Sequence, residues 1–229
     1  MNESKQFDAD EIRRSISVLK PNNELFEVRI IKGKAITSGY FCEAETLIRE
    51  LSKLDLRQCN VYFTLQQLHE GCAARLQYEH FMSVGRMNDI PTTSDNDAIG
   101  YHYIPIDLDP CRPKGISSND QELHFAEEVR DSIVEYMEDQ GYSDPIRGFS
   151  GNGYHLLYRI NWPGNREPAK RVQAIINRLD ELFSNEHCEV DKTVFSPGQI
   201  FKLYGTFAQK GRSTQDRPHR LSHLIGGAS

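Results

Sequence analysis

The chain has 229 residues and a formal charge of −6, with 38% hydrophobic, 26% charged and 10% aromatic residues. These proportions are typical of a globular protein, and they exclude a fibre, a disordered tail and a uniformly basic nucleic-acid coat. No apolar run approaches the roughly 20 residues that cross a bilayer, and the polar N-terminus does not resemble a signal peptide, so we expect a cytoplasmic protein with no membrane partner.

The first ninety residues predict an α/β lobe. Helical spacing of apolar residues predicts helices over 9–19 and 43–54, and β-rich or alternating apolar runs predict strands over 26–31 and 60–65. Turn-forming residues from Pro91 to Gly100 then separate this lobe, about 1–92, from a second lobe, about 93–229. We expect the two lobes to form a single catalytic domain.

The second lobe begins with a β-rich run over 103–108 that ends at Pro110. Helices are predicted over 121–140 and 168–184, with a strand over 154–160 between them. Short strands are predicted over 189–195 and 201–204. This order predicts an α+β fold in which helices back a small sheet.

Asp107 and Asp109 are two residues apart, so on a strand both carboxylates point to one face while Ile106 and Leu108 point to the other. Adjacent carboxylates repel each other and are costly to bury, and a divalent cation offsets that cost. The pair alone is weak evidence, because strand ends and turns often carry such pairs by chance.

A second acidic strand strengthens the metal hypothesis. Asp191 follows a long helix, where a neighbouring strand begins, and Glu189 competes with it on the same face. Three carboxylates can hold two Mg²⁺ or Mn²⁺ ions roughly 4 Å apart. The five cysteines are scattered and form no zinc-binding cluster, so no zinc is expected.

The loop from Ser150 to His155 reads SGNGYH. Gly151 and Gly153 let backbone amides approach an anion, and the hydroxyl and imidazole can bind phosphate oxygens, so the loop predicts a phosphate site. The alternative is a glycine hairpin with an ordinary strand histidine. Lys202 alternates with apolar neighbours and points away from their face, as a surface lysine also does.

The stretch from Lys192 to His223 contains six Lys or Arg residues and one acid, a net charge of +5. This stretch is a candidate for phosphate contact. A solvated basic loop has the same composition, so the two interpretations stay open.

Three segments, taken in chain order, resemble the three motifs of the archaeo-eukaryotic primase superfamily. They are hydrophobic-Asp-hydrophobic-Asp (106–109), SGNGYH (150–155) and Val190-Asp191. Further stretches resemble its phage, plasmid and CRISPR-associated primase-polymerases: GYF (39–41), VYFTL (61–65), DLDPCRPKGIS (107–117), SGNGYHLLYRI (150–160), FKLYGTFAQKG (201–211) and RPHR (217–220). The resemblance spans nearly the whole chain.

The resemblance implies an N-terminal α/β lobe and a catalytic lobe related to the RNA-recognition motif. It implies metals on Asp107, Asp109 and Asp191, triphosphate contacts from Ser150 and His155, and Lys202 facing the incoming nucleotide. By location in the sequence we add further candidate nucleotide-binding or template residues: Asn152, Gly153, Lys210 and Arg212.

The function expected from these residues is template-dependent nucleotidyl transfer, as a DNA primase, a DNA polymerase or both. The expected partners are a single-stranded DNA template, a primer strand, and dNTPs or NTPs. A metal-dependent nuclease is the alternative, and a catalytically inert nucleic-acid-binding relic is a third interpretation. The family's zinc-binding and helicase or C-terminal domains are absent from this sequence, so excision from a longer protein, with a helicase or CRISPR adaptation proteins as partners, is an open expectation.

Overall fold

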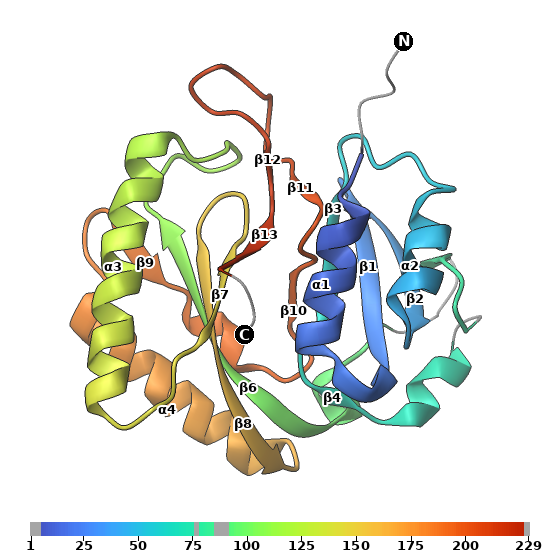
Figure 1. The fold of residues 1–229 in the computed structure, drawn as a ribbon, viewed down its shortest axis with the longest axis horizontal. Helices are drawn as coiled ribbons and strands as arrows, with labels where there is room; N and C mark the ends of the chain where they lie inside the picture. Colours follow the sequence, from blue (N-terminus) through green and yellow to red (C-terminus); the bar gives the residue numbers. More distant parts are fainter. Residues whose placement is uncertain (1–5, 76–77, 85–91, 227–229) are drawn as a thin grey trace.

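The computed structural model describes residues 6–75, 78–84 and 92–226, which fold into two mainly antiparallel β-sheets with helices packed on them (Figure 1). Pro91, the first residue of the expected inter-lobe segment, lies outside these ranges. From Ser94 onward the segment forms a short 3₁₀ helix, Asp95–Asp97, that leads directly into the second sheet.

The first sheet has the strand order β10-β3-β1-β2-β5. Its strands are β1 (Phe26–Lys32), β2 (Ala35–Phe41), β3 (Asn60–Thr64), β5 (Met82–Val84) and β10 (Ile200–Lys202). Helices α1 (Ala9–Leu19) and α2 (Ala44–Leu51) share its core, to which each contributes fully buried leucine or isoleucine side chains. Asp8 begins α1 by accepting hydrogen bonds from the amides of residues 10 and 11.

The second sheet is built on the 13-residue strand β6 (Ala98–Pro110). Its other strands are β7 (Ile146–Phe149), β8 (Tyr154–Pro163), β9 (Cys188–Val190), β13 (His223–Ile225) and the two-residue β4 (Gln67–Leu68). Helices α3 (Asp120–Asp139) and α4 (Arg166–Phe183) pack on it and on each other (Figure 1). A small ribbon of β11 (Phe207–Ala208) and β12 (Arg220–Leu221) completes the fold.

Within the second sheet, the elements follow the chain order β6-α3-β7-β8-α4-β9, and the strands lie in the spatial order β9-β6-β8-β7. This is a β-α-β-β-α-β unit of the kind found in ferredoxin-like and RNA-recognition-motif sheets. The α+β fold class and the expected catalytic-lobe topology are therefore confirmed.

Most expected elements are present, with shifted ends. The helix expected over 43–54 ends at Leu51. The strand expected over 189–195 was wrong beyond Val190, because Asp191 caps a 3₁₀ helix at Lys192–Phe195 instead. No helix within the described ranges is long and apolar enough to span a membrane.

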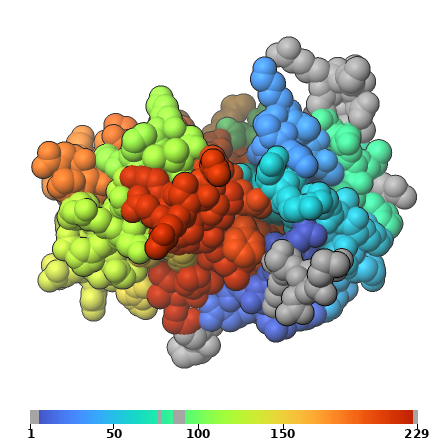
Figure 2. Space-filling model, turned by 90° about the horizontal axis from the view of Figure 1, so that it is seen from above, coloured from blue at the N-terminus to red at the C-terminus, as the bar shows by residue number. Residues whose placement is uncertain are grey.

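The chain passes between the sheets more than once. Gln67–Leu68, early in the sequence, pairs with β6 of the second sheet, and Ile200–Lys202, late in the sequence, pairs with β3 of the first. Figure 2 shows the C-terminal residues, in red, between the blue first lobe and the green α3 segment. A division of the chain near residue 92 therefore does not assign each sheet to one part of the sequence, because each sheet contains a strand from the other part.

Candidate active site

The acidic pair lies at the end of β6, on the face opposite the helices. Ile106 and Leu108 are fully buried in the core, whereas the side chains of Asp107 and Asp109 are 22% and 44% exposed. This alternation is the one expected for a half-buried strand. Both carboxylates therefore open onto one face of the sheet.

Strand pairing brings two further motif residues to Asp107. His155 on β8 is directly opposite Asp107, and its Nε2 lies 3.5 Å from an Asp107 carboxylate oxygen. On the other side, the amide of Asp191, the residue after β9, donates to the Asp107 carbonyl oxygen at 2.9 Å. The three separate motifs thus meet on adjacent strands.

Seven of the ten residues expected in the site line one pocket between the two sheets. They are Asp107, Asp109, Ser150, Asn152, His155, Lys202 and Lys210. Asp191 instead lines an adjoining hollow, which shares Asp109 with the first pocket and also contains Glu189. Gly153 and Arg212 line neither of these two pockets.

The electrostatics of Asp107 fit a cation site. Burial raises the pKa of Asp107 well above its usual value, and the charges of Asp109 and Asp191 raise it further. Lys210 and Arg112 act in the opposite direction, and Arg112 lies 3.3 Å from Asp109. A divalent cation bound there would stabilise the ionised form of Asp107. The all-oxygen donor set is the one that Mg²⁺ and Mn²⁺ prefer.

The third carboxylate is engaged elsewhere. Asp191 accepts hydrogen bonds from the amide and hydroxyl of Thr193, both at 2.8 Å and both on Oδ1. Within the described ranges, no three His, Cys, Asp or Glu side chains are arranged to hold a metal ion. The Asp107–Asp109 pair is thus in place, whereas the expected three-residue ligand set stays a prediction.

The SGNG segment is the turn of the β7–β8 hairpin, closed by a hydrogen bond from the Ser150 amide to the Gly153 carbonyl oxygen at 2.9 Å. Gly153 has a packing role: a Cβ there would lie 2.2 Å from the carbonyl oxygen of Leu108. The hairpin alternative therefore describes the backbone correctly. A simple glycine hairpin does not account for the unpartnered side-chain amide of Asn152.

Asn152 lines the pocket and has an unpartnered side-chain donor. Ser118 holds both its side chain and its backbone: the Ser118 amide donates to Oδ1 at 2.9 Å, and the Ser118 hydroxyl donates to the Asn152 backbone carbonyl oxygen at 2.7 Å. The residue is only 3% exposed, and its Nδ2 has no hydrogen-bond partner among the described residues. A buried, unpaired donor is costly, and because Asn152 lines the pocket, its Nδ2 is a candidate donor for a ligand oxygen.

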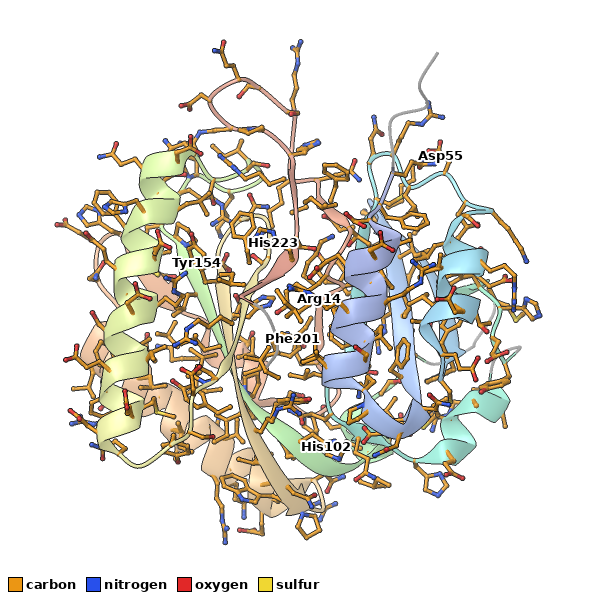
Figure 3. The ribbon with its side chains drawn as sticks, viewed as in Figure 1. Arg14, Asp55, His102, Tyr154, Phe201 and His223 are labelled. Atoms are coloured by element: carbon orange, nitrogen blue, oxygen red, sulfur yellow. The ribbon has the colours of Figure 1, made fainter. Side chains whose placement is uncertain are left out.

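His155 is buried and neutral. Burial lowers its pKa to about 4, against a smaller opposing effect of Asp109. Its Nδ1 lies 2.8 Å from the Tyr204 hydroxyl, and its ring packs edge-on against Phe201 of β10 at 5.6 Å. Figure 3 shows Phe201 in the middle of the molecule, between the two lobes.

The first sheet contributes the other side of the pocket. Lys202 is 5% exposed and donates from Nζ to the Phe207 carbonyl oxygen at 2.7 Å. Burial, with a smaller contribution from the charge of Lys210, lowers its pKa to about 7. Asn60 and Tyr62 of β3 also line the pocket, and burial together with Asp107 and Asp109 raises the pKa of Tyr62.

Much of the basic C-terminal stretch is paired with acids. Arg217 lies 2.7 Å from Glu122, and Arg220 lies 2.6 Å from Asp120. Lys192 is paired in the same way with Asp180, at 2.7 Å. The expected charge of +5 is therefore largely offset in the folded chain. Arg217 and Arg220 also connect this stretch to the start of α3.

Reasoning from the sequence missed several side chains that the structure brings to the site. Arg112 lies beside Asp109, Tyr62 lines the pocket, and Tyr204 contacts His155. Arg112 and Tyr204 lie inside the motif-like stretches DLDPCRPKGIS and FKLYGTFAQKG, which is a signal that could have marked them. Tyr62 lies inside the motif-like stretch VYFTL, but its position beside Lys202 depends on the pairing of β10 with β3, which no local pattern reveals.

No protein-family model and no curated protein sequence matches the chain. Among solved structures, the chain is similar to the AEP domain (PP-N190) of the Cyanophage S-2L primase-polymerase (PrimPol), with a TM-score of 0.53 and 12% identity, over 98% of this chain and 92% of that one. The fold is that of a primase-polymerase domain. A second similarity is to primase RepB′, with a TM-score of 0.51 and 9% identity, over 95% of this chain and 56% of that one.

Proposed function

We propose that the chain is a template-dependent nucleotidyltransferase, a DNA primase, a DNA polymerase or both, that joins nucleotides with release of pyrophosphate. One observation carries this proposal. A single pocket is lined by two carboxylates suited to a divalent cation and, with them, by two lysines suited to phosphate and an asparagine whose amide donor has no partner among the described residues. A nucleoside triphosphate with its metal presents the charges that match both groups.

Asp107 and Asp109, together with Asp191, would hold Mg²⁺ or Mn²⁺. Bound there, the metal would supply charge stabilisation to the triphosphate and would lower the pKa of an attacking hydroxyl. Asn152 Nδ2 and the neutral His155 ring donate hydrogen bonds without adding charge. Lys202 supplies positive charge from the opposite sheet.

The remaining candidate residues have weaker support. Ser150 lines the pocket, but its hydroxyl donates to the Gly153 carbonyl oxygen at 3.1 Å. Lys210 is exposed, and we assign it to the triphosphate or to the template strand. Arg212 is exposed outside the pocket, and we propose for it a contact with the template. Gly153 acts through its backbone, by letting the hairpin turn pack against β6.

The proposed partners are a single-stranded DNA template, a primer strand, and dNTPs or NTPs. The fold similarity to primase and primase-polymerase domains supports this class of substrate. A helicase or CRISPR adaptation proteins are proposed partners in a longer protein, and the cytoplasm is the proposed location.

The test incubates the protein with Mg²⁺ or Mn²⁺, a single-stranded template and labelled dNTPs or NTPs, with and without a primer. We expect nucleotide incorporation that is lost in the double variant Asp107→Ala plus Asp109→Ala. The matched control, Glu138→Ala plus Asp139→Ala, removes two exposed acids at the end of α3 and keeps the activity.

Each outcome distinguishes one part of the proposal. Products only with a primer restrict the activity to a polymerase. Degradation of single-stranded DNA without incorporation supports the nuclease alternative and overturns our proposal. Unchanged activity in the Asp107 and Asp109 variant overturns the assigned site.

A further inference from the structure

Tyr204 fills a place beside His155 that the strand register leaves empty. Gly148 on β7 is directly opposite His155 on β8, so no side chain stands next to the imidazole at that position. A Cβ at residue 148 would lie 2.1 Å from the Tyr204 hydroxyl oxygen. The phenol therefore occupies the space that the glycine leaves, from a segment that follows β10.

The contact between the two rings is buried and specific. Tyr204 is 1% exposed and His155 is 3% exposed. The hydroxyl lies 2.8 Å from His155 Nδ1, and His155 is its one hydrogen-bond partner among the described residues. The opposite nitrogen of the imidazole, Nε2, lies 3.5 Å from the Asp107 carboxylate.

Only one tautomer of a neutral imidazole satisfies both contacts. If Nδ1 carried the hydrogen, the buried Tyr204 hydroxyl hydrogen would lack an acceptor, and the Nε2 lone pair would face a carboxylate. If Nε2 carries the hydrogen, Tyr204 donates to Nδ1, and Nε2–H points toward the carboxylate side of the pocket. A charged imidazole is excluded by the same geometry: both of its nitrogens carry hydrogen, so the Tyr204 hydroxyl hydrogen would again lack an acceptor.

We propose that Tyr204 is a positioning residue, for which Gly148 leaves the space, and that it holds His155 as the Nε2–H tautomer with this hydrogen directed into the nucleotide pocket. The role in nucleotide binding rests on the proposed function, whereas the tautomer does not. In this arrangement His155 is a neutral, oriented donor for a phosphate oxygen, and Tyr204 does not contact the nucleotide itself.

The first measurement is ¹⁵N NMR of the imidazole nitrogens of the full chain at pH 7.5, with His155 identified by comparison with His155→Gln. The two ring nitrogens of a neutral imidazole have well-separated shifts, which show which nitrogen carries the hydrogen. We expect Nε2–H. An Nδ1–H tautomer or a charged imidazole in the wild-type protein overturns the proposal without any variant having to fold.

The second measurement uses Tyr204→Phe, which removes only the hydroxyl. We expect the ¹⁵N signals of His155 to change, and the Kd for dATP and the KM for incorporation to rise about fivefold with kcat nearly unchanged, as for loss of one neutral hydrogen bond. The control is Tyr158→Phe, because the Tyr158 hydroxyl is buried without a partner among the described residues. We expect that control to leave the His155 signals and the Kd unchanged.

The outcomes separate this inference from the proposed function. A wild-type protein that incorporates no nucleotide contradicts the proposed function, while an Nε2–H signal that changes in Tyr204→Phe still supports the positioning role. A folded Tyr204→Phe protein with wild-type His155 signals overturns the positioning role, even when the wild-type protein is an active polymerase. Equal changes in Tyr158→Phe overturn it as well.

Discussion

Lys202 and Tyr62 are direct cross-strand partners on β10 and β3, and the Lys202 Nζ lies 5.6 Å from the centre of the Tyr62 ring. The lysine is thus buried beside an aromatic face, where a charged amine keeps some electrostatic compensation. Its pKa of about 7, set by burial and by Lys210, places it near half protonation at neutral pH.

This pKa predicts proton uptake on nucleotide binding. A triphosphate favours the charged amine and therefore raises the pKa of Lys202, so above pH 7 binding draws a proton from solution. We expect nucleotide affinity to fall by up to about tenfold per pH unit above pH 7, until the pKa of the bound state is reached. Calorimetry at pH 8 in buffers of different ionisation enthalpy measures the uptake. Lys202→Arg should abolish the uptake, and its persistence in that variant would contradict the assignment.

Asn152→Asp tests the unpartnered donor. The variant keeps an oxygen for the Ser118 amide but replaces Nδ2 with an anionic oxygen. Loss of a hydrogen bond to a charged phosphate, worth about 1.5–3 kcal/mol, predicts a KM for nucleotide at least about tenfold higher. Asn119→Asp is the matched control, because its oxygen caps α3 and its amide is not needed for that cap. Equal KM values for the two variants would refute a nucleotide contact at Asn152.

The ion pairs within the basic stretch, residues 192–223, predict which of its Lys and Arg side chains are free to bind DNA phosphates. Lys210→Ala and Arg212→Ala should each lower the slope of log K against log salt for single-stranded DNA binding, by about 0.7 for each phosphate that the variant no longer neutralises. Arg217→Ala should leave that slope unchanged, because its guanidinium is paired with Glu122 and donates to the Ser117 carbonyl oxygen. It should instead lower the stability. Binding isotherms over a salt series, with urea unfolding of the same variants, test both statements.

Asp97 predicts part of the acid sensitivity of the fold. Hydrogen bonds from Arg75 lower its pKa most strongly, and those from Ser94 add to the effect, against the opposing effect of burial. Because the folded pKa is below the unfolded value of about 3.9, the stabilisation is complete above that pH and is lost as the pH falls through the folded value. Asp97→Asn should cost about 1–3 kcal/mol at pH 7.

Urea unfolding at several pH values checks this sign. The difference in unfolding free energy between wild type and Asp97→Asn should be largest near neutral pH and should shrink below about pH 4. Asp139→Asn, at an exposed position, provides the control. A difference that grows on acidification would show that Asp97 is not an ionised, paired carboxylate in the folded state.

Local patterns predicted the elements that bury a regular apolar face. The apolar stripe of α4 and the alternating apolar residues of β3 could be recognised without tertiary information, because the spacing of apolar residues in each segment is itself that of a helix or a strand. The β2 strand was missed because AITSGYF does not alternate cleanly. The β7 strand, IRGF, is too short to show a period, and its glycine is required by Tyr204 rather than by the strand itself.

The sequence predicted that candidate residues lie close together where they stand on adjacent strands of one sheet. Asp107, Asp109 and His155 meet by register within the second sheet, so the order of the motifs was sufficient. Tyr62 and the engagement of Asp191 by Thr193 could not be predicted in this way. The first depends on pairing between residues about 140 positions apart, and the second on the 3₁₀ helix that Asp191 caps in place of the expected strand.

The C-terminal segment is also held by α1, since Arg14 of that helix, labelled in Figure 3, donates hydrogen bonds to the carbonyl oxygens of Leu224 and Gly226. During synthesis, β3 leaves the ribosome well before its partner β10, so the first sheet keeps an open edge until residue 202 has emerged. Closing that edge is a late, long-range step of folding. Nascent chains that end before β10 therefore lack the proposed nucleotide pocket, which can form only after residue 202 has been synthesised.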